Sequence, residues 1–145
     1  MHDDSLRVWR ESPVFKAVCR AEMDELRAST PSVQAAIIAT ADGFDVADVC
    51  SDKRYSPARL SAMASSMMAL AGAVAKEADY PDCGSLIVES SGGKTIMMSL
   101  PGTDGRLVLL VIADNSTPFG MLLMNGRQCA HRIQKRLNLT SDSTN

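Results

Sequence analysis

Apolar residues recur at helical spacing in three segments of the chain, and the segment over residues 56–80 is the longest. It begins with Ser56, whose hydroxyl can cap free backbone N–H groups, and with Pro57, whose ring pre-sets φ for the first turn. Pro81 ends it, because the residue before a proline is pushed out of the helical region. The other two helices begin after similar serine and proline signals, one near each end of the chain.

The central helix carries two neighbouring apolar stripes, whereas a surface helix needs only one. We expect the first stripe to lie on the chain's own sheet. The second is rich in alanine, which lets another backbone come close, so we expect it to meet a partner. A helix fully buried within one domain is the alternative. The first stripe is Leu60, Met63, Met67, Leu70 and Val74, and the second is Ala64, Met68, Ala71, Ala75 and Ala78.

Five further segments have the composition of strands. The two most apolar, 33–40 and 106–113, are typical of strands covered on both faces, so we expect them in the middle of a sheet. The turn Asp42-Gly43 is a strong hairpin signal after the first of them. The remaining predicted strands cover residues 44–50, 85–90 and 95–100.

The two predicted edge strands differ in how they are protected. Asp45 and Asp48 place charges in strand 44–50, which discourages pairing with other strands. Strand 85–90 has no charge before its end. An unprotected edge strand of that kind is expected to pair with another strand, and the simplest partner is the same strand of a second copy. Its apolar residues are Leu86, Ile87 and Val88.

The element order predicts an α-β-β-α-β-β-β-α fold of the α+β class with a mostly antiparallel sheet. We assign one domain to residues 12–138, which is long enough to bury a core. Residues 1–11 form a polar leader whose order is left open, and residues 139–145 are expected to be a flexible tail.

Composition and charge exclude several classes of partner. The net charge of −2 gives no reason to expect nucleic acid or an anionic membrane, and no secretory signal opens the chain. The uncharged run 60–75 is expected to be too short, and too rich in small residues, to span a bilayer. Four widely spaced cysteines and two histidines predict no metal site, no cofactor and a reducing, cytoplasmic location.

Three patterns suggest catalytic chemistry, and none is complete. Gly93-Lys94-Thr95 ends like a phosphate-binding loop, but Val88 stands where the first glycine belongs and a strand follows instead of a helix. Ser65 lacks a histidine near it in the sequence to act as its base. His131 lies among Lys and Arg residues and favours a solvated basic face, which could also meet an acidic partner. We therefore expect no enzyme.

In this order and spacing, four segments resemble the roadblock/LC7 family, and the resemblance extends over about residues 13–137. They are residues 37–47 (IIATADGFDVA), 60–71 (LSAMASSMMALA), 86–89 (LIVE), and 109–113 (LLVIA) ahead of 118–123 (PFGMLL).

The resemblance implies a five-stranded sheet with the central helix on one face and the two terminal helices on the other. It also implies a homodimer joined through the central helix and the third strand, which serves as a non-catalytic platform for a small Ras-like GTPase. A motor-complex scaffold and a small-molecule sensor remain the alternatives. The expected dimer interface is Ala64, Met68, Ala71, Ala75, Leu86, Ile87 and Val88.

The expected GTPase interface lies on the flank of the central helix and on the loop that leads into it. Tyrosine and arginine are the types most enriched at the centres of protein interfaces. The residues there that are able to make polar contacts are Arg54, Tyr55, Arg59, Ser61, Ser65 and Lys76.

Overall fold

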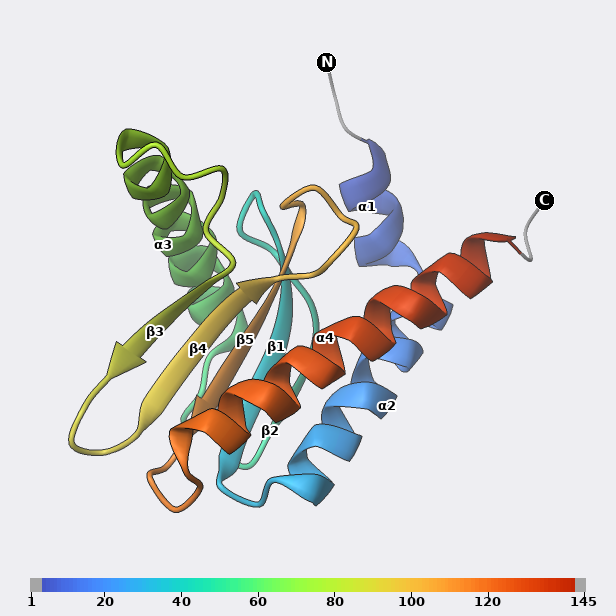
Figure 1. The fold of residues 1–145 in the computed structure, drawn as a ribbon. Helices are drawn as coiled ribbons and strands as arrows, with labels where there is room; N and C mark the ends of the chain where they lie inside the picture. The colour runs from blue at the N-terminus through green and yellow to red at the C-terminus, as the bar shows by residue number, and fades with distance from the viewer. Residues whose placement is uncertain (1–3, 143–145) are drawn as a thin grey trace.

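The computed structural model describes residues 4–142, and describes side chains over residues 6–137. These described residues form four helices and five strands (Figure 1). Their bounds are α1 (Asp4–Glu11), α2 (Pro13–Ser29), β1 (Val33–Thr40), β2 (Asp45–Cys50), α3 (Pro57–Glu77), β3 (Ser85–Glu89), β4 (Lys94–Ser99), β5 (Leu107–Ala113) and α4 (Phe119–Asp142).

The five strands form one sheet in the order β2-β1-β5-β4-β3, and every neighbouring pair is antiparallel. The predicted α+β class is confirmed. The most apolar strands, β1 and β5, lie inside the sheet as expected, and β2 and β3 form its two edges. Each strand begins and ends within one residue of its predicted bounds.

Helices cover the sheet on both faces, so the domain has three layers (Figure 1). The larger core cluster lies on the face under α2 and α4 and includes Met23 and Leu26 from α2 and Ile133 from α4. On the other face α3 lies alone, over a smaller cluster centred on Ile37, Val108 and Leu110. This is the arrangement that the family resemblance implied.

The leader, whose order the sequence left open, contains helix α1. The Trp9 ring lies 6.1 Å from the Phe15 ring of α2, and the Arg106 guanidinium lies 5.1 Å above the Trp9 ring. Arg10 lies 3.8 Å above the ring of Phe44, in the turn between β1 and β2. Aromatic and cation–π contacts of this kind tie α1 to the end of the sheet. Most of residues 1–11 therefore belong to the domain.

The C-terminal boundary also differs from the prediction. Helix α4 continues to Asp142, beyond residue 138 where the predicted domain ends, and the flexible tail over residues 139–145 stays a prediction. The last three residues of that tail lie outside the part of the chain that the structure describes. Polar residues such as Ser141 and Asp142 favoured a tail in the sequence, but a helix can continue through polar residues when its earlier turns are anchored on a core.

Candidate protein-interaction surface

Local signals position α3 at both of its ends. The Ser56 hydroxyl accepts a hydrogen bond from the Arg59 backbone N–H at 3.3 Å, and Pro57 opens the first turn. At the other end Asp79 adopts a left-handed conformation with φ of 62°, and the Tyr80 N–H donates to the Ala75 carbonyl at 2.8 Å. This is the Schellman pattern that ends many helices.

The alanine stripe of α3 faces the chain's own sheet, which reverses the prediction. Ala64 is 1% exposed and belongs to the cluster beneath α3, and Met68 packs against that cluster. Ala71 and Ala75 are half-buried. An alanine on this face lets the helix backbone come close to the strands, so the small residues serve contact within the domain. Ala64 cannot take part in a dimer interface.

Three larger apolar side chains of α3 point away from the sheet, whereas Leu60 and Met67 of the same predicted stripe pack against the cluster beneath the helix. Met63, Leu70 and Val74 are 56%, 68% and 69% exposed, and they share one face at helical spacing. By length and composition α3 could cross a membrane, with a mean hydropathy of 1.3 over 18 residues, although α3 lies on the sheet in this structure. This helix is longer than the uncharged run 60–75, so the expectation that the run does not span a bilayer stays a prediction. We call Met63, Leu70 and Val74 the outer α3 face.

Strand β3 continues this apolar surface at the edge of the sheet. Leu86 packs under α3, whereas Ile87 and Val88 are exposed. On its outer side β3 pairs with no other strand of the part that the structure describes. Of the three predicted interface residues in this strand, two are accessible and Leu86 belongs partly to the chain's own core.

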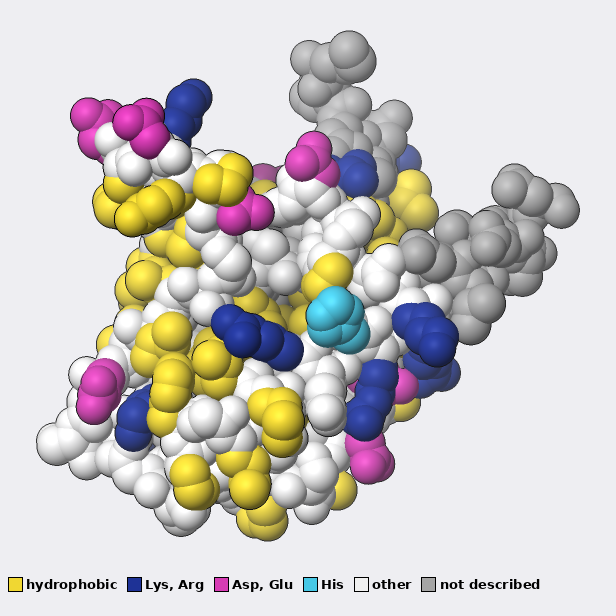
Figure 2. All heavy atoms as spheres, viewed as in Figure 1, with side chains coloured by type: hydrophobic (Ala, Val, Ile, Leu, Met, Phe, Trp, Pro, Cys, Tyr) yellow, Lys and Arg dark blue, Asp and Glu magenta, His cyan; other side chains and the backbone are white. Residues whose placement is uncertain are grey.

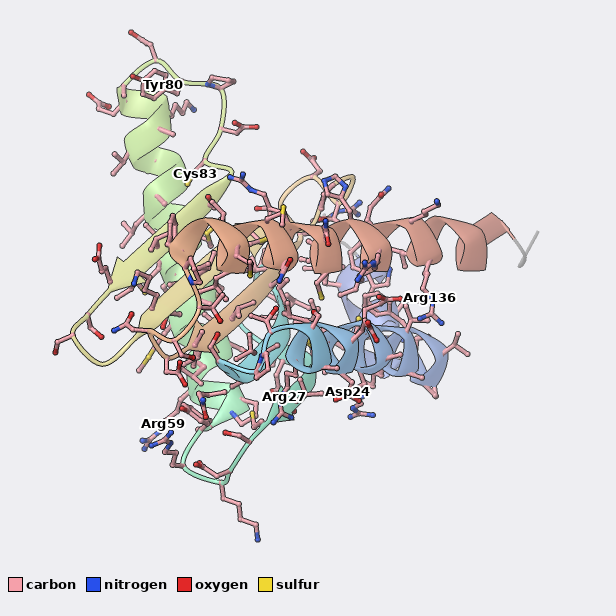
Figure 3. All side chains as sticks on the ribbon, turned by 60° about the horizontal axis from the view of Figure 1, so that its bottom comes forward. Asp24, Arg27, Arg59, Tyr80, Cys83 and Arg136 are labelled. Carbon is pink, nitrogen blue, oxygen red and sulfur yellow. The ribbon has the colours of Figure 1, made fainter. Side chains whose placement is uncertain are left out.

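Three of the predicted GTPase contacts gather where α3 begins. Arg54 donates a hydrogen bond to the Tyr55 hydroxyl at 3.0 Å, and its guanidinium lies 4.9 Å from the centre of the Tyr55 ring. An ion pair of 3.3 Å to Asp52 holds Arg54 from the other side. Arg59 is exposed at this end of α3, opposite the end that carries Tyr80 (Figure 3). We call Arg54, Tyr55 and Arg59 the basic cluster.

The other three predicted contacts do not join the basic cluster. Ser65 and Lys76 line a separate hollow of about 590 Å³ beside Pro81 and Cys83. Ser61 is fully buried, and its hydroxyl has no hydrogen-bond partner among the described residues. It therefore cannot touch a partner. The prediction failed because the stripe assignment placed Ser61 on the open side of the helix, whereas it faces the sheet.

The remaining candidates for chemistry have structural roles. The Lys94 ammonium donates to the Asn115 side chain at 2.8 Å, from the first residue of β4. Burial raises the pKa of Cys19 and of Cys129 to about 12. A thiol with such a pKa stays protonated at neutral pH and is a poor nucleophile. Among the described residues, no group of three potential metal ligands comes together.

The comparisons with known proteins agree with this geometry. Residues 20–113 match the Roadblock/LC7 domain. The chain belongs to the Roadblock/LC7 family. No curated protein matches it by sequence.

Solved structures share the fold of this Roadblock/LC7 chain at low sequence identity. Myxococcus xanthus MglB is 17% identical with a TM-score of 0.72, over 88% of this chain and 98% of that one. The gliding protein MglB from Thermus thermophilus is 13% identical with a TM-score of 0.76, over 86% and 91%. An MglB with a tetrameric arrangement is 15% identical with a TM-score of 0.77, over 86% and 90%.

Both stripes of this Roadblock/LC7 helix are apolar, so hydrophobicity alone does not say which one is buried. The structure divides the first stripe, because Leu60 and Met67 pack against the cluster beneath α3 whereas Met63, Leu70 and Val74 are exposed. The pattern that marks the buried face is Leu60, Ala64, Met67 and Ala71, which recur at steps of four and three.

Replacing Ser61 by alanine should leave the fold intact and raise the free energy of unfolding by about 1 kcal/mol, because it removes a buried hydroxyl that makes no hydrogen bond. Urea unfolding of both proteins at one protein concentration measures the change. Ser65→Ala is the matched control. Its hydroxyl donates to the Ala62 carbonyl at 3.0 Å, so its loss should change stability by less than about 0.5 kcal/mol. A destabilised Ser61→Ala protein would contradict this account of the helix face.

Proposed function

We propose that this protein is a non-catalytic homodimer that binds a small Ras-like GTPase and modulates it. The observation that carries the dimer is the outer α3 face, where three aliphatic side chains are more than half exposed beside an unpaired strand edge. Apolar surface of this kind on a folded domain marks an interaction site. A second copy presents the same helix and the same edge, so one two-fold axis can cover both features.

Burial of the outer α3 face in a dimer is favourable in free energy. Burying an exposed aliphatic side chain fully contributes about 1.5–3 kcal/mol, and a symmetric interface buries Met63, Leu70 and Val74 twice. Pairing of β3 with its copy adds main-chain hydrogen bonds that a lone edge lacks. An MglB with the same fold has a tetrameric arrangement, which supports assembly as a property of such domains.

The GTPase part of the proposal rests on the family resemblance together with the basic cluster. Arg54, Tyr55 and Arg59 lie at the start of α3, on the side of the sheet where α3 packs, and two of them are held by the contacts described above. Arginine and tyrosine that are already positioned lose little freedom on binding. Arg54 and Tyr55 also line a hollow of about 380 Å³ with Val88 of β3, so the cluster borders the proposed seam.

A regulator should distinguish the nucleotide states of its GTPase, whereas a motor-complex scaffold need not. Ras-like GTPases rearrange their switch segments with the bound nucleotide, so a surface that contacts these segments binds one state more tightly. We place this activity in the cytoplasm, which the four free cysteines support.

The double substitution Leu70→Asp/Val74→Asp should convert the dimer to a folded monomer. Each aspartate would be buried in the seam without a partner, at a cost of several kcal/mol per ion. Light scattering on a size-exclusion column measures the mass at micromolar concentration, and circular dichroism reports the fold.

The matched control is Val8→Asp/Val14→Asp, which alters two valines that are 61% and 58% exposed on α1 and α2. This control should remain a dimer. A wild-type protein that elutes as a monomer, or a Leu70→Asp/Val74→Asp protein that stays dimeric, would show that the outer α3 face is not the seam.

Replacing Arg54, Tyr55 or Arg59 singly by alanine should weaken GTPase binding and leave the dimer intact. Loss of one strong interface contact costs at least about 2 kcal/mol, which is roughly thirtyfold in affinity. The measurement is calorimetric titration with the small GTPase that copurifies with the protein, loaded with GDP or with a non-hydrolysable GTP analogue.

Arg20→Ala, an exposed arginine on α2, provides the control and should bind like wild type. Equal affinity for both nucleotide states would mean that the protein tethers its GTPase and does not regulate it. Unchanged affinity in all three variants would place the GTPase on another surface.

A further inference from the structure

Helix α4 exposes a second surface, which neither the proposed dimer nor the basic cluster uses. Its outward residues recur at steps of three and four and therefore lie along one face. Met121 and Met124 are each 51% exposed, and Arg127, His131 and Lys135 follow them in exposed positions. We call these five residues the α4 ridge. Its first part is apolar and its second part is basic.

The ridge is visible as two zones of the surface. Figure 2 shows apolar side chains over the first turns of α4 and over neighbouring β3 and β4, and basic side chains with the histidine further along α4. Ile87 belongs to the apolar zone, because successive residues of a strand point to opposite faces and its neighbour Leu86 points to α3. The zone thus continues from the helix onto the sheet.

The charge of this face is one-sided. Residues 119–141 contain no Asp or Glu. Arg136 forms an ion pair of 3.1 Å with Glu22 of α2, and Figure 3 shows it between the two helices. Arg127, Arg132 and Lys135, in contrast, make no ion pair with any residue that the structure describes. Arg127 and Lys135 of the ridge are therefore available for an acidic partner, in a protein whose net charge is −2.

The surface beside the ridge is hollowed where the cations begin. Arg127, Ala130 and His131 line a hollow of about 220 Å³ with Met98 of β4 and Pro101 of the following turn. The ridge extends 14 residues beyond Met121, to Lys135, which is roughly 21 Å along a helix. A ligand that uses both zones must therefore extend over at least two helical turns.

We propose that the α4 ridge binds an acidic amphipathic helix of a partner protein. Apolar side chains of that helix lie on Met121, Met124 and Ile87, and its carboxylates, one to two turns further along, contact Arg127, His131 and Lys135. Exposed methionines suit this role, because their flexible, polarisable side chains adapt to different apolar partners. The α4 ridge is on the opposite face of the sheet from α3, and only Ile87 belongs to a strand that the proposed dimer also uses.

The shape of the face favours a peptide over an anionic membrane. A bilayer is flat on this scale and would leave the hollow under Arg127 unfilled, whereas a carboxylate side chain can enter it. The whole protein also carries a small negative charge, which opposes binding to a negative surface.

The test is the binding of a defined probe to the full chain, measured by fluorescence anisotropy. The probe is a fluorescein-labelled, alanine-based helix of 16 residues with two leucines three positions apart and two glutamates one and two turns beyond them. We expect saturable binding that weakens at high salt, because the charged contacts are screened. Met121→Ser/Met124→Ser and Arg127→Glu/Lys135→Glu should each weaken binding at least about tenfold.

Matched controls distinguish binding at the α4 ridge from nonspecific hydrophobic or electrostatic binding. Val14→Ser changes an exposed apolar residue on α2, and Arg20→Glu reverses an exposed charge there. Neither should change the affinity by more than about twofold. Probes with lysine in place of glutamate, or serine in place of leucine, should bind at least about tenfold more weakly. Circular dichroism of every variant confirms the fold.

Two results would overturn the proposal. One is failure of the probe to bind, or binding that the ridge variants do not weaken. The other is sedimentation of the protein with vesicles containing phosphatidylserine, abolished by Arg127→Glu/Lys135→Glu, when the probe does not bind; this would assign the ridge to a membrane.

Discussion

One face of the five-stranded sheet carries a single helix of the described residues, α3, and this constraint determines much of the molecule. Ala64 meets the layer formed by Ile37, Val108 and Leu110. The helix also packs Leu60, Met67 and Met68 against that layer, while its Leu70 and Val74 stay outside. A single helix cannot also cover β3 at the edge. The same packing that closes the monomer core therefore leaves an apolar surface beside an open strand.

The fold could be predicted from the sequence because most of its signals act locally. Serine caps, prolines and the Asp42-Gly43 turn fix where elements begin and end, and apolar runs identify the inner strands. The order of helix α1 could not be predicted, because its place depends on Trp9 meeting Arg106, nearly a hundred residues later.

The surfaces were predicted less well than the fold, for a related reason. Which of two apolar stripes is buried depends on the volumes of residues on other elements, and this information is not local. The reversal of the stripes moved Ser61 and Ala64 from the predicted interfaces into the core. Arg54, Tyr55 and Arg59 kept their predicted accessibility at the start of α3, because a loop and a first helical turn are exposed whichever stripe is buried. Opposite faces of the sheet thus present two different surfaces. The surface at α3 is apolar, and the surface at α4 has an apolar part followed by a basic part.

The measurement that tests the central claim most directly is amide hydrogen exchange over residues 85–89 as the protein is diluted. In the monomer, one side of β3 has no strand to accept its N–H groups. If a second copy covers the outer α3 face and pairs with β3, these amides exchange slowly at high protein concentration and faster on dilution, while those of β5 stay protected throughout. Exchange over residues 85–89 that is equally fast at every concentration would contradict the account.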